Sequence, residues 1–168
     1  FFLTVIFDLT IAIEVGLVIA CVLFMRRVME TTEISVIKDE INPNAESDIT
    51  VHEENLVIPK GVEVYEINGP YFFGIATKFE EIMSRLGDRP KVRIIRMRKV
   101  PFIDSTGIHN LTNLCQMAQR EKTSIVLSGV NEKVHNALQK SGFYELLGEK
   151  NICPNINVAL ERAEALLK

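Results

Sequence analysis

The chain has 168 residues, with 19 Lys and Arg against 22 Asp and Glu, a formal net charge of −3 and a hydrophobic fraction of 47%. This near-neutral balance argues against a dedicated nucleic-acid binder, which carries a strongly basic surface, and the composition excludes collagen-like, low-complexity and wholly disordered chains. Cys21, Cys115 and Cys153 form no CxxC pair, so the sequence predicts neither a disulfide framework nor a zinc site.

The chain opens with an apolar segment from Phe1 to Met25 that contains two charged side chains, Asp8 and Glu14. A helix rises about 1.5 Å per residue, so the segment is long enough to cross a bilayer core of about 30 Å. A carboxylate at membrane depth normally faces a protein interior or an aqueous cavity. We therefore predict a helix packed among other membrane helices, with Gly16 as a position where it could break in two. Because the first residue is Phe inside an apolar run, we interpret the chain as the C-terminal piece of a longer protein.

Arg26 and Arg27 follow the apolar segment, and a basic pair at this position is retained on the cytoplasmic side. We therefore expect the rest of the chain to be cytoplasmic, at the cell (inner) membrane. A signal peptide would need a positive n-region and a shorter apolar stretch, and the lipoprotein-like VIAC sequence is followed by apolar VLFM instead of a polar tether. The remaining alternative is a buried core helix, against which the length and the absence of a polar face argue.

A polar connector separates this segment from a soluble domain. Residues 30–57 lack helical periodicity and include a turn-rich stretch at 42–48. We therefore expect a transmembrane segment at 1–29, a linker with few packing contacts at 30–57, and an independent domain at 58–168.

The domain begins with a predicted β-hairpin. VEVYEI at 62–67 alternates as a strand does, a Gly-Pro turn follows, and YFFGI at 71–75 is a short apolar strand. Next comes a helix that starts at a capping box of Thr77 and Glu80 and ends at Gly87.

The rest of the domain alternates strands and helices. The expected elements are a strand at 91–97, a helix at 105–122, a strand at 124–130, a helix at 131–141 ended by Gly142, a weak strand at 151–153 and a last helix from Asn157. After the hairpin the order is therefore βαβαβαβα. This order predicts an α/β fold, a mostly parallel sheet covered by helices.

The sequence contains few groups that could catalyse a reaction. It has no GxSxG, HExxH, GxxxxGK[ST] or GxGxxG motif, and its histidines (His52, His109 and His135) are isolated from one another and from other metal-ligand spacings. We therefore expect neither an enzyme nor a cofactor or metal site.

The segment RKVPFIDSTG joins the end of a predicted parallel strand to the start of a helix, where ligands and regulators act in open α/β sheets. Ser105 would lie at the helix N-terminus, where free N–H groups favour an anion, so a phosphate there would add about −1.5 to −2 charge units to an exposed surface. Asp104, Thr106 and Gly107 complete this loop, and Gly107 would let a partner approach closely. The alternative is simple N-capping by Asp104 or Ser105.

A basic run begins within the predicted strand at 91–97 and extends just beyond it; it comprises Lys91, Arg93, Arg96, Arg98 and Lys99. One interpretation is a solvated strand edge and loop. Under a membrane anchor, the same charges could face anionic headgroups. No aromatic residues interleave with them for base stacking, which argues against nucleic acid as a partner.

Two parts of the sequence resemble a known family. TVIFDLTIAIEVGLVIACVLFMRRV resembles the last membrane segment of the SulP anion permeases, and VIPKGVEVYEINGPYFFGIATKF with FIDSTGIHNL resembles the STAS domain that follows it. The resemblance implies a secondary transporter for sulfate or another small anion, usually a homodimer, whose STAS domain lies in the cytoplasm with regulatory and assembly roles. The partners implied are the membrane, the rest of the transmembrane domain and a cytoplasmic regulatory protein or kinase.

STAS domains are also similar to bacterial anti-sigma factor antagonists, in which a partner kinase phosphorylates the serine directly after the Asp of this loop. The matching residue is Ser105. The alternative function is therefore a membrane-anchored, partner-switching signalling protein. Asp8 and Glu14 favour the transporter, because an isolated anchor has no reason to hold two carboxylates in lipid.

Overall fold

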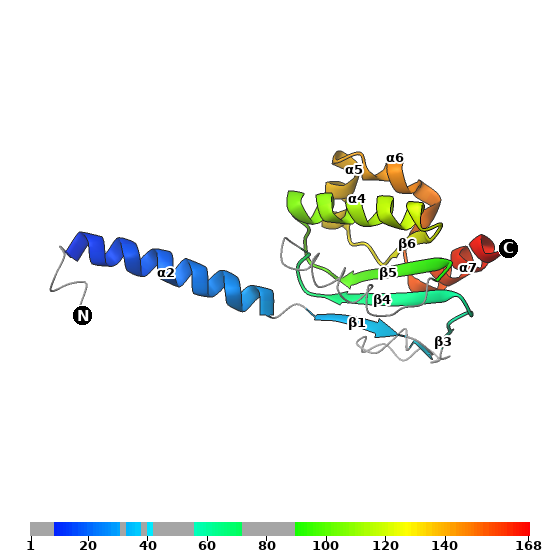
Figure 1. Cartoon of the computed structure of the whole chain (residues 1–168), viewed down its shortest axis with the longest axis horizontal. Helices are drawn as coiled ribbons and strands as arrows, with labels where there is room; N and C mark the ends of the chain where they lie inside the picture. Colours follow the sequence, from blue (N-terminus) through cyan, green and yellow to red (C-terminus); the bar gives the residue numbers. More distant parts are fainter. Residues whose placement is uncertain (1–8, 31–32, 38–39, 42–55, 72–89) are drawn as a thin grey trace. The chain divides into compact units, whose positions relative to one another are not determined.

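The computed structural model describes residues 9–30, 33–37, 40–41, 56–71 and 90–168 (Figure 1). The chain divides into two compact units, Phe1–Thr32 and Glu33–Lys168. The features expected at 42–48, at 72–75 and at 77–87 lie outside the described residues, as do Asp8 and His52.

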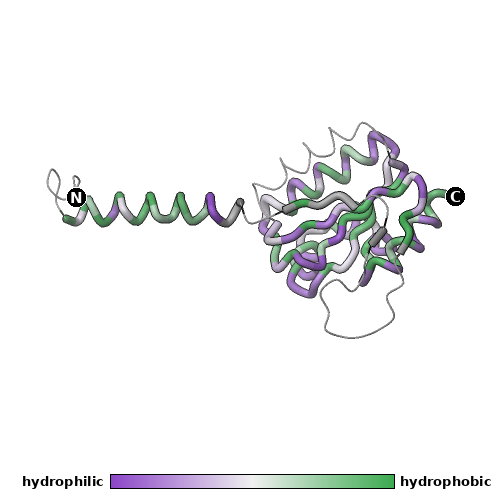
Figure 2. The backbone as a smooth tube through the Cα atoms, turned by 90° about the horizontal axis from the view of Figure 1, so that it is seen from below, coloured by the Kyte–Doolittle hydropathy of each residue, from purple (hydrophilic) through white to green (hydrophobic). Residues whose placement is uncertain are grey.

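In the first unit the described residues form the helix α2 (Leu9–Glu30), which continues through Gly16 without a break. Its stretch Leu9–Arg27 has a mean hydropathy of 2.2 and is long and apolar enough to cross a membrane by length and composition. Figure 2 shows apolar residues along almost all of α2. Between Leu9 and Arg27 no side chain is buried, and most of the apolar side chains are exposed, as is Glu14.

The second unit is built on a five-stranded sheet with the order β1–β4–β5–β6–β7. The strands are β1 (Glu33–Ile37), β4 (Val62–Asn68), β5 (Val92–Lys99), β6 (Ser124–Ser128) and β7 (Ile152–Cys153). β1 pairs antiparallel with β4, and the other neighbours pair in parallel. A separate two-stranded ladder joins β2 (Glu40–Ile41) to β3 (Leu56–Val57).

Helices cover both faces of this sheet. They are α4 (Ser105–Arg120), α5 (Glu132–Lys140), α6 (Phe143–Leu147), the 3₁₀ helix η1 (Glu149–Asn151) and α7 (Ile156–Leu167). α4, α5 and α6 share one hydrophobic core with the sheet, and α7 shares another. The predicted α/β fold with a mostly parallel, helix-covered sheet is confirmed.

The two cores arise from the alternation of side chains along buried parallel strands. Successive residues of a strand point to opposite faces, so Tyr65 and Ile95 enter the core under α4, whereas Val64 and Ile94 enter the core under α7. Because both faces are covered, consecutive residues of β5 and of β6 are buried.

The antiparallel partner of β4 differs from the prediction. β4 pairs antiparallel with β1 on one side and in parallel with β5 on the other. Of the predicted second strand of the hairpin, the structure describes only Tyr71, which makes a parallel bridge to Ile103. The expectation of a linker with few contacts is likewise wrong at Glu33–Ile37, because these residues form the strand β1.

Asparagine side chains begin two of the helices. Asn131 accepts a hydrogen bond from the N–H of Val134 at the start of α5, and Asn155 accepts one from the N–H of Val158 at the start of α7, both at 3.0 Å. Gly142 follows α5 with a φ of 75°, a left-handed conformation that ends a helix at little cost. The predicted boundaries of these helices are therefore confirmed to within a residue or two.

Candidate functional site

The loop between β5 and α4 is held in place by the backbone of Tyr71. The N–H of Tyr71 donates to the carbonyl of Phe102 at 3.1 Å, and the N–H of Asp104 donates to the carbonyl of Tyr71 at 3.4 Å. The Tyr71 ring lies in the core. The loop therefore has a fixed backbone although Phe102 is 49% exposed at the surface.

Asp104 is the N-cap of α4. Its backbone is extended, with φ −96° and ψ 175°, and its Oδ1 accepts a hydrogen bond from the N–H of Gly107 at 2.6 Å. Its carbonyl accepts the bond from Ile108 at 2.9 Å that opens the helix ladder. Of the two capping residues that the sequence allowed, the structure selects Asp104, so the Ser105 hydroxyl is not required as the cap.

Ser105 is the first residue of α4, and both Ser105 and Thr106 are exposed. In an α-helix the first N–H groups have no intrahelical acceptor. The Asp104 carboxylate uses the N–H of Gly107, which leaves the N–H groups of Ser105 and Thr106 directed toward the helix N-terminus. A phosphate on the Ser105 hydroxyl would lie beside these donors and the positive end of the helix dipole.

Gly107 is buried, which changes the role that the sequence suggested for it. A Cβ atom at this position would overlap the carbonyl oxygen of Tyr71 and lie 2.9 Å from the side chain of Ile103. The missing side chain therefore lets α4 pack closely against the Tyr71 backbone. The prediction that Gly107 admits an external partner is wrong.

Two residues of the basic run, Arg93 and Arg96, are placed differently from either interpretation. Arg93 and Arg96 are buried in β5, in register with Glu63 and Glu66 of β4. The Nη1 of Arg96 lies 3.2 Å from Oε1 of Glu66. Since paired, buried guanidinium groups cannot reach lipid headgroups, Arg93 and Arg96 form neither a solvated edge nor a membrane-facing patch.

Arg93 belongs to a second group of buried charges near the start of the strands. Its Nη1 lies 3.6 Å from Glu121, and its Nε lies 4.0 Å from Glu63. The Tyr65 hydroxyl donates to Glu63 at 2.6 Å. Burial, followed by this hydrogen bond and the charge of Glu63, raises the pKa of Tyr65 well above its usual range. Of the other basic residues of the run, Lys91 and Arg98 are exposed and Lys99 is half-buried.

The two described histidines lie on different helices and have different hydrogen-bond partners. The ring of His109 on α4 shares a hydrogen bond with the amide of Asn113, 3.2 Å away, and His135 on α5 is hydrogen-bonded to the Tyr144 hydroxyl. Among the described residues, no three His, Cys, Asp or Glu side chains come close enough to hold a metal ion.

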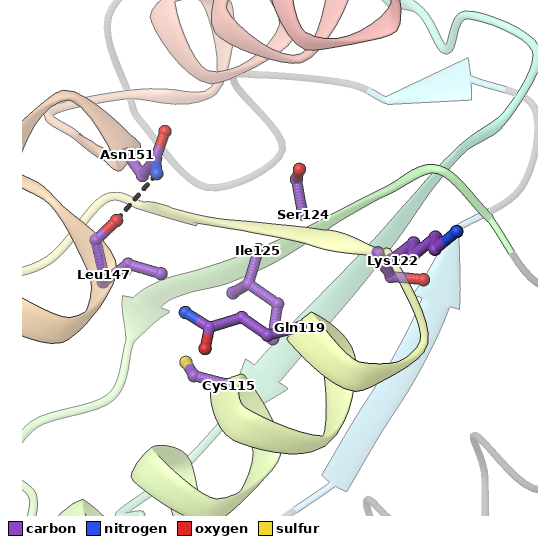
Figure 3. Close-up of a pocket in the computed structure, with 8 residues that line it drawn as sticks. Cys115, Gln119, Lys122, Ser124, Ile125, Leu147 and Asn151 are labelled. Atoms are coloured by element: carbon purple, nitrogen blue, oxygen red, sulfur yellow. Dashed lines mark hydrogen bonds between the residues drawn. The ribbon is translucent and has the colours of Figure 1, made fainter.

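A pocket of about 300 Å³ lies at the opposite end of the sheet, between the end of α4 and the start of β6 (Figure 3). In Figure 3, Cys115 and Gln119 project from α4 beside Ile125 and Leu147. Burial raises the pKa of the Cys115 thiol to about 12. The thiol is therefore protonated at neutral pH and is a poor nucleophile.

The sequence predicts the Ser105 loop but not the role of Tyr71, which anchors this loop. The signal for Tyr71 is weak, because one aromatic residue after a Gly-Pro turn also fits an ordinary strand. The buried arginines had a clearer signal. Glu63 and Glu66 are three positions apart, and so are Arg93 and Arg96. One parallel register can therefore pair each glutamate with one arginine.

Comparison with known proteins agrees with this geometry. The STAS domain family matches residues 54–159. A sulfate transporter family protein from Wolinella succinogenes is 43% identical, with a TM-score of 0.63, and the match covers 67% of this chain and 92% of that chain. A SulP transporter STAS domain from Vibrio cholerae is 34% identical, with a TM-score of 0.59, and the match covers 66% and 87% of the two chains.

A longer relative matches both units. Sulfate transporter 1.1 of Arabidopsis thaliana is 28% identical over an alignment of 166 positions, which covers 90% of this chain and 25% of that protein. The chain thus spans about a quarter of the length of the curated relatives it matches. The family match, together with the two close domain structures, identifies the second unit. The chain belongs to the STAS domain family, as the STAS domain of a SulP (sulfate transporter) family protein.

Proposed function

We propose that this chain is the C-terminal part of a secondary-active transporter for sulfate or another small anion, with the STAS domain as its regulatory and assembly module. The observation that carries the proposal is the combination, in one chain, of a SulP-type STAS domain and a helix long enough to cross a membrane. In this proposal residues 1–29 form the last membrane segment, 30–57 join it to the domain, and 58–168 form the core of the STAS domain.

The proposal assigns the STAS domain to the cytoplasmic side of the cell (inner) membrane. Arg26 and Arg27 at the end of α2 support this side, because basic flanks resist translocation. Glu14 supports a helix that packs among other membrane helices, since an exposed carboxylate in lipid is unfavourable. The partners are then the rest of the transmembrane domain and, in a homodimer, a second copy of the chain.

Ser105 is the proposed regulatory position, with a cytoplasmic kinase or regulatory protein as its partner. Three observations support it: the hydroxyl is exposed, Asp104 alone supplies the cap, and free N–H donors surround the site where a phosphate would lie. Phosphorylation would add about −1.5 to −2 charge units at a loop whose backbone is fixed, and so would change how a partner docks.

The test measures uptake of radiolabelled sulfate by cells that express the transporter carrying this chain. We expect Ser105→Asp to change uptake, and Ser105→Ala to abolish its response to the state of the cell. Thr106→Ala removes the neighbouring exposed hydroxyl and is the matched control. If all three variants transport and respond as the unmodified protein does, Ser105 has no regulatory role.

Stability measurements separate regulation from capping. Ser105→Ala should leave the free energy of unfolding within about 0.5 kcal/mol of its original value. Asp104→Ala should lower it by about 0.5 to 2 kcal/mol, and Asp104→Asn, which still caps, should restore most of the loss. If cells show no anion uptake at all while Ser105→Asp releases a cytoplasmic partner, the partner-switching signalling function replaces the transporter.

A further inference from the structure

A second pocket, of about 390 Å³, lies at the carboxyl ends of β6 and β7. It is lined by His135 and Gln139 of α5, Tyr144 of α6, Glu149 of η1 and Cys153 at the end of β7. The carboxyl ends of parallel strands are where open α/β sheets bind ligands, and the volume is within the range of small-molecule sites. The Ser105 loop contributes no residue to this pocket.

The aromatic wall of the pocket is held in one orientation. The Tyr144 hydroxyl is hydrogen-bonded to Nδ1 of His135, and the two rings meet edge to face, with centroids 5.2 Å apart and planes at 83°. This bond leaves Nε2 of His135 available to a ligand. The side chain of Gln139 adds a carbonyl oxygen on the same helix as His135.

The charge of the pocket is negative. Glu149 lines it, and no Lys or Arg is among the residues that line it. Within the described part of the chain the Glu149 carboxylate has no ion-pair partner. Burial, and secondarily the charge of Glu149, raise the pKa of Tyr144, so its hydroxyl stays protonated at neutral pH.

We propose that this pocket binds a small organic cation, a guanidinium or primary ammonium group, which pairs with Glu149 and lies against the ring of Tyr144. A cation gains both a carboxylate partner and the negative face of an aromatic ring. The carbonyl oxygen of Gln139 would accept from the remaining N–H donors of such a group, and so would Nε2 of His135 in the tautomer whose Nδ1–H donates to the Tyr144 oxygen. An anion would instead be repelled by Glu149, which is the one charged residue among those that line the pocket. The charge of Arg162 reaches Cys153 on the pocket wall, but Arg162 does not line the pocket and its Nε donates to Asn151 at 2.9 Å.

The experiment is a titration of the full chain in detergent, followed through the NMR signals of the His135 and Tyr144 rings. The cationic probe is N-acetyl-arginine amide, and the matched anionic probe is N-acetyl-aspartate amide. We expect a saturable shift of both rings with the cationic probe and none with the anionic probe. Glu149→Gln should weaken binding by at least about tenfold, because it removes the charge but keeps the shape.

Glu145→Gln is the control, since Glu145 is an exposed carboxylate on α6 that does not line the pocket. It should bind the probe as the unmodified chain does. Free arginine, tested in parallel, distinguishes the source of the cation. Tighter binding of free arginine indicates a metabolite, and tighter binding of the blocked form indicates a basic side chain of another protein.

The proposal is overturned if the cationic probe causes no saturable shift, if the anionic probe binds at least as tightly, or if Glu149→Gln and Glu145→Gln affect binding equally. Tyr144→Phe gives a second check, because it keeps the ring and removes the hydroxyl. This variant should still bind the cationic probe, whereas Tyr144→Leu, which removes the ring, should bind it more weakly. These outcomes do not depend on sulfate transport.

Discussion

Glu66 of β4 and Arg96 of β5 are in register, with Oε1 of Glu66 3.2 Å from Nη1 of Arg96. The two side chains are only 13% and 8% exposed. On the other side of Arg96, the residue in register on β6 is Ser128, whose hydroxyl is buried and makes no hydrogen bond. Within the described part of the chain, the charge of Arg96 is therefore balanced by Glu66 alone.

Arg96→Ala should lower the free energy of unfolding by about 3 kcal/mol, because it leaves a buried carboxylate without its counterion. Lys91→Ala, at an exposed position just before β5, should change it by less than about 0.5 kcal/mol. Urea unfolding followed by circular dichroism measures both. The double variant Glu66→Gln, Arg96→Met should recover most of the loss, since it removes both charges together. If Arg96→Ala and Lys91→Ala have equal free energies of unfolding, this role of the ion pair is contradicted.

Gly107→Ala should destabilise the domain by about 1 to 3 kcal/mol, because the added Cβ overlaps backbone at Tyr71, which cannot rotate away. Thr106→Ala, one position earlier and exposed, is the control and should leave the midpoint of thermal unfolding almost unchanged. A Gly107→Ala variant that melts with the unmodified chain would mean that α4 does not pack closely on Tyr71.

The stability of the domain should fall at alkaline pH. The pKa of Cys115 is raised from 9.0 to about 12 on folding, so above pH 9 the unfolded chain has lost the thiol proton and the folded chain still holds it. The unfolded state then binds fewer protons, so the free energy of unfolding decreases as pH rises, by up to about 1.4 kcal/mol per pH unit for this group.

Denaturation series between pH 9 and pH 11 measure this slope. Cys115→Ala leaves a small cavity and lowers stability at every pH, but its slope should be shallower than that of the unmodified chain. Cys21→Ala, in the exposed helix α2, is the control and should keep the original slope. Identical slopes for the two variants would show that the Cys115 thiol does not titrate as described.

Removal of β1 should weaken the STAS domain. A fragment that starts at residue 33 keeps the antiparallel pairing of β1 with β4, and a fragment that starts at residue 38 loses only that strand. We expect the longer fragment to be more stable by about 2 kcal/mol or more, since several backbone hydrogen bonds along β4 are lost together. Urea midpoints compare the two, and equal midpoints would restore the description of residues 30–57 as a linker.

Local patterns in the sequence were sufficient for most elements of the second unit. The helices α4, α5 and α7 follow from apolar periodicity and from capping residues such as Asp104, Asn131 and Asn155, which act on their immediate neighbours. The strand β6 follows from its apolar run. The short helix α6 was missed, because its five residues are too few to show a helical period.

Strand pairing could not be read in the same way. β1 lies more than twenty positions before β4 in the sequence. Local patterning instead favoured the nearer segment at 71–75 as the partner of β4. The choice depends on which edge of β4 is free once β5 has paired, which is a property of the assembled sheet.

The sequence by itself determined that a membrane-length apolar helix precedes an α/β domain, and that Ser105 lies where a strand ends and a helix begins. Those features depend on residues that are close together in the chain. Only the tertiary structure decided that Asp104 rather than Ser105 is the cap, that Gly107 packs on Tyr71, and that Arg96 is buried with Glu66. Each of these three features depends on backbone conformation or on a segment that is distant in the sequence. The guanidinium of Arg96, for example, can be buried because a carboxylate from another strand is in register with it.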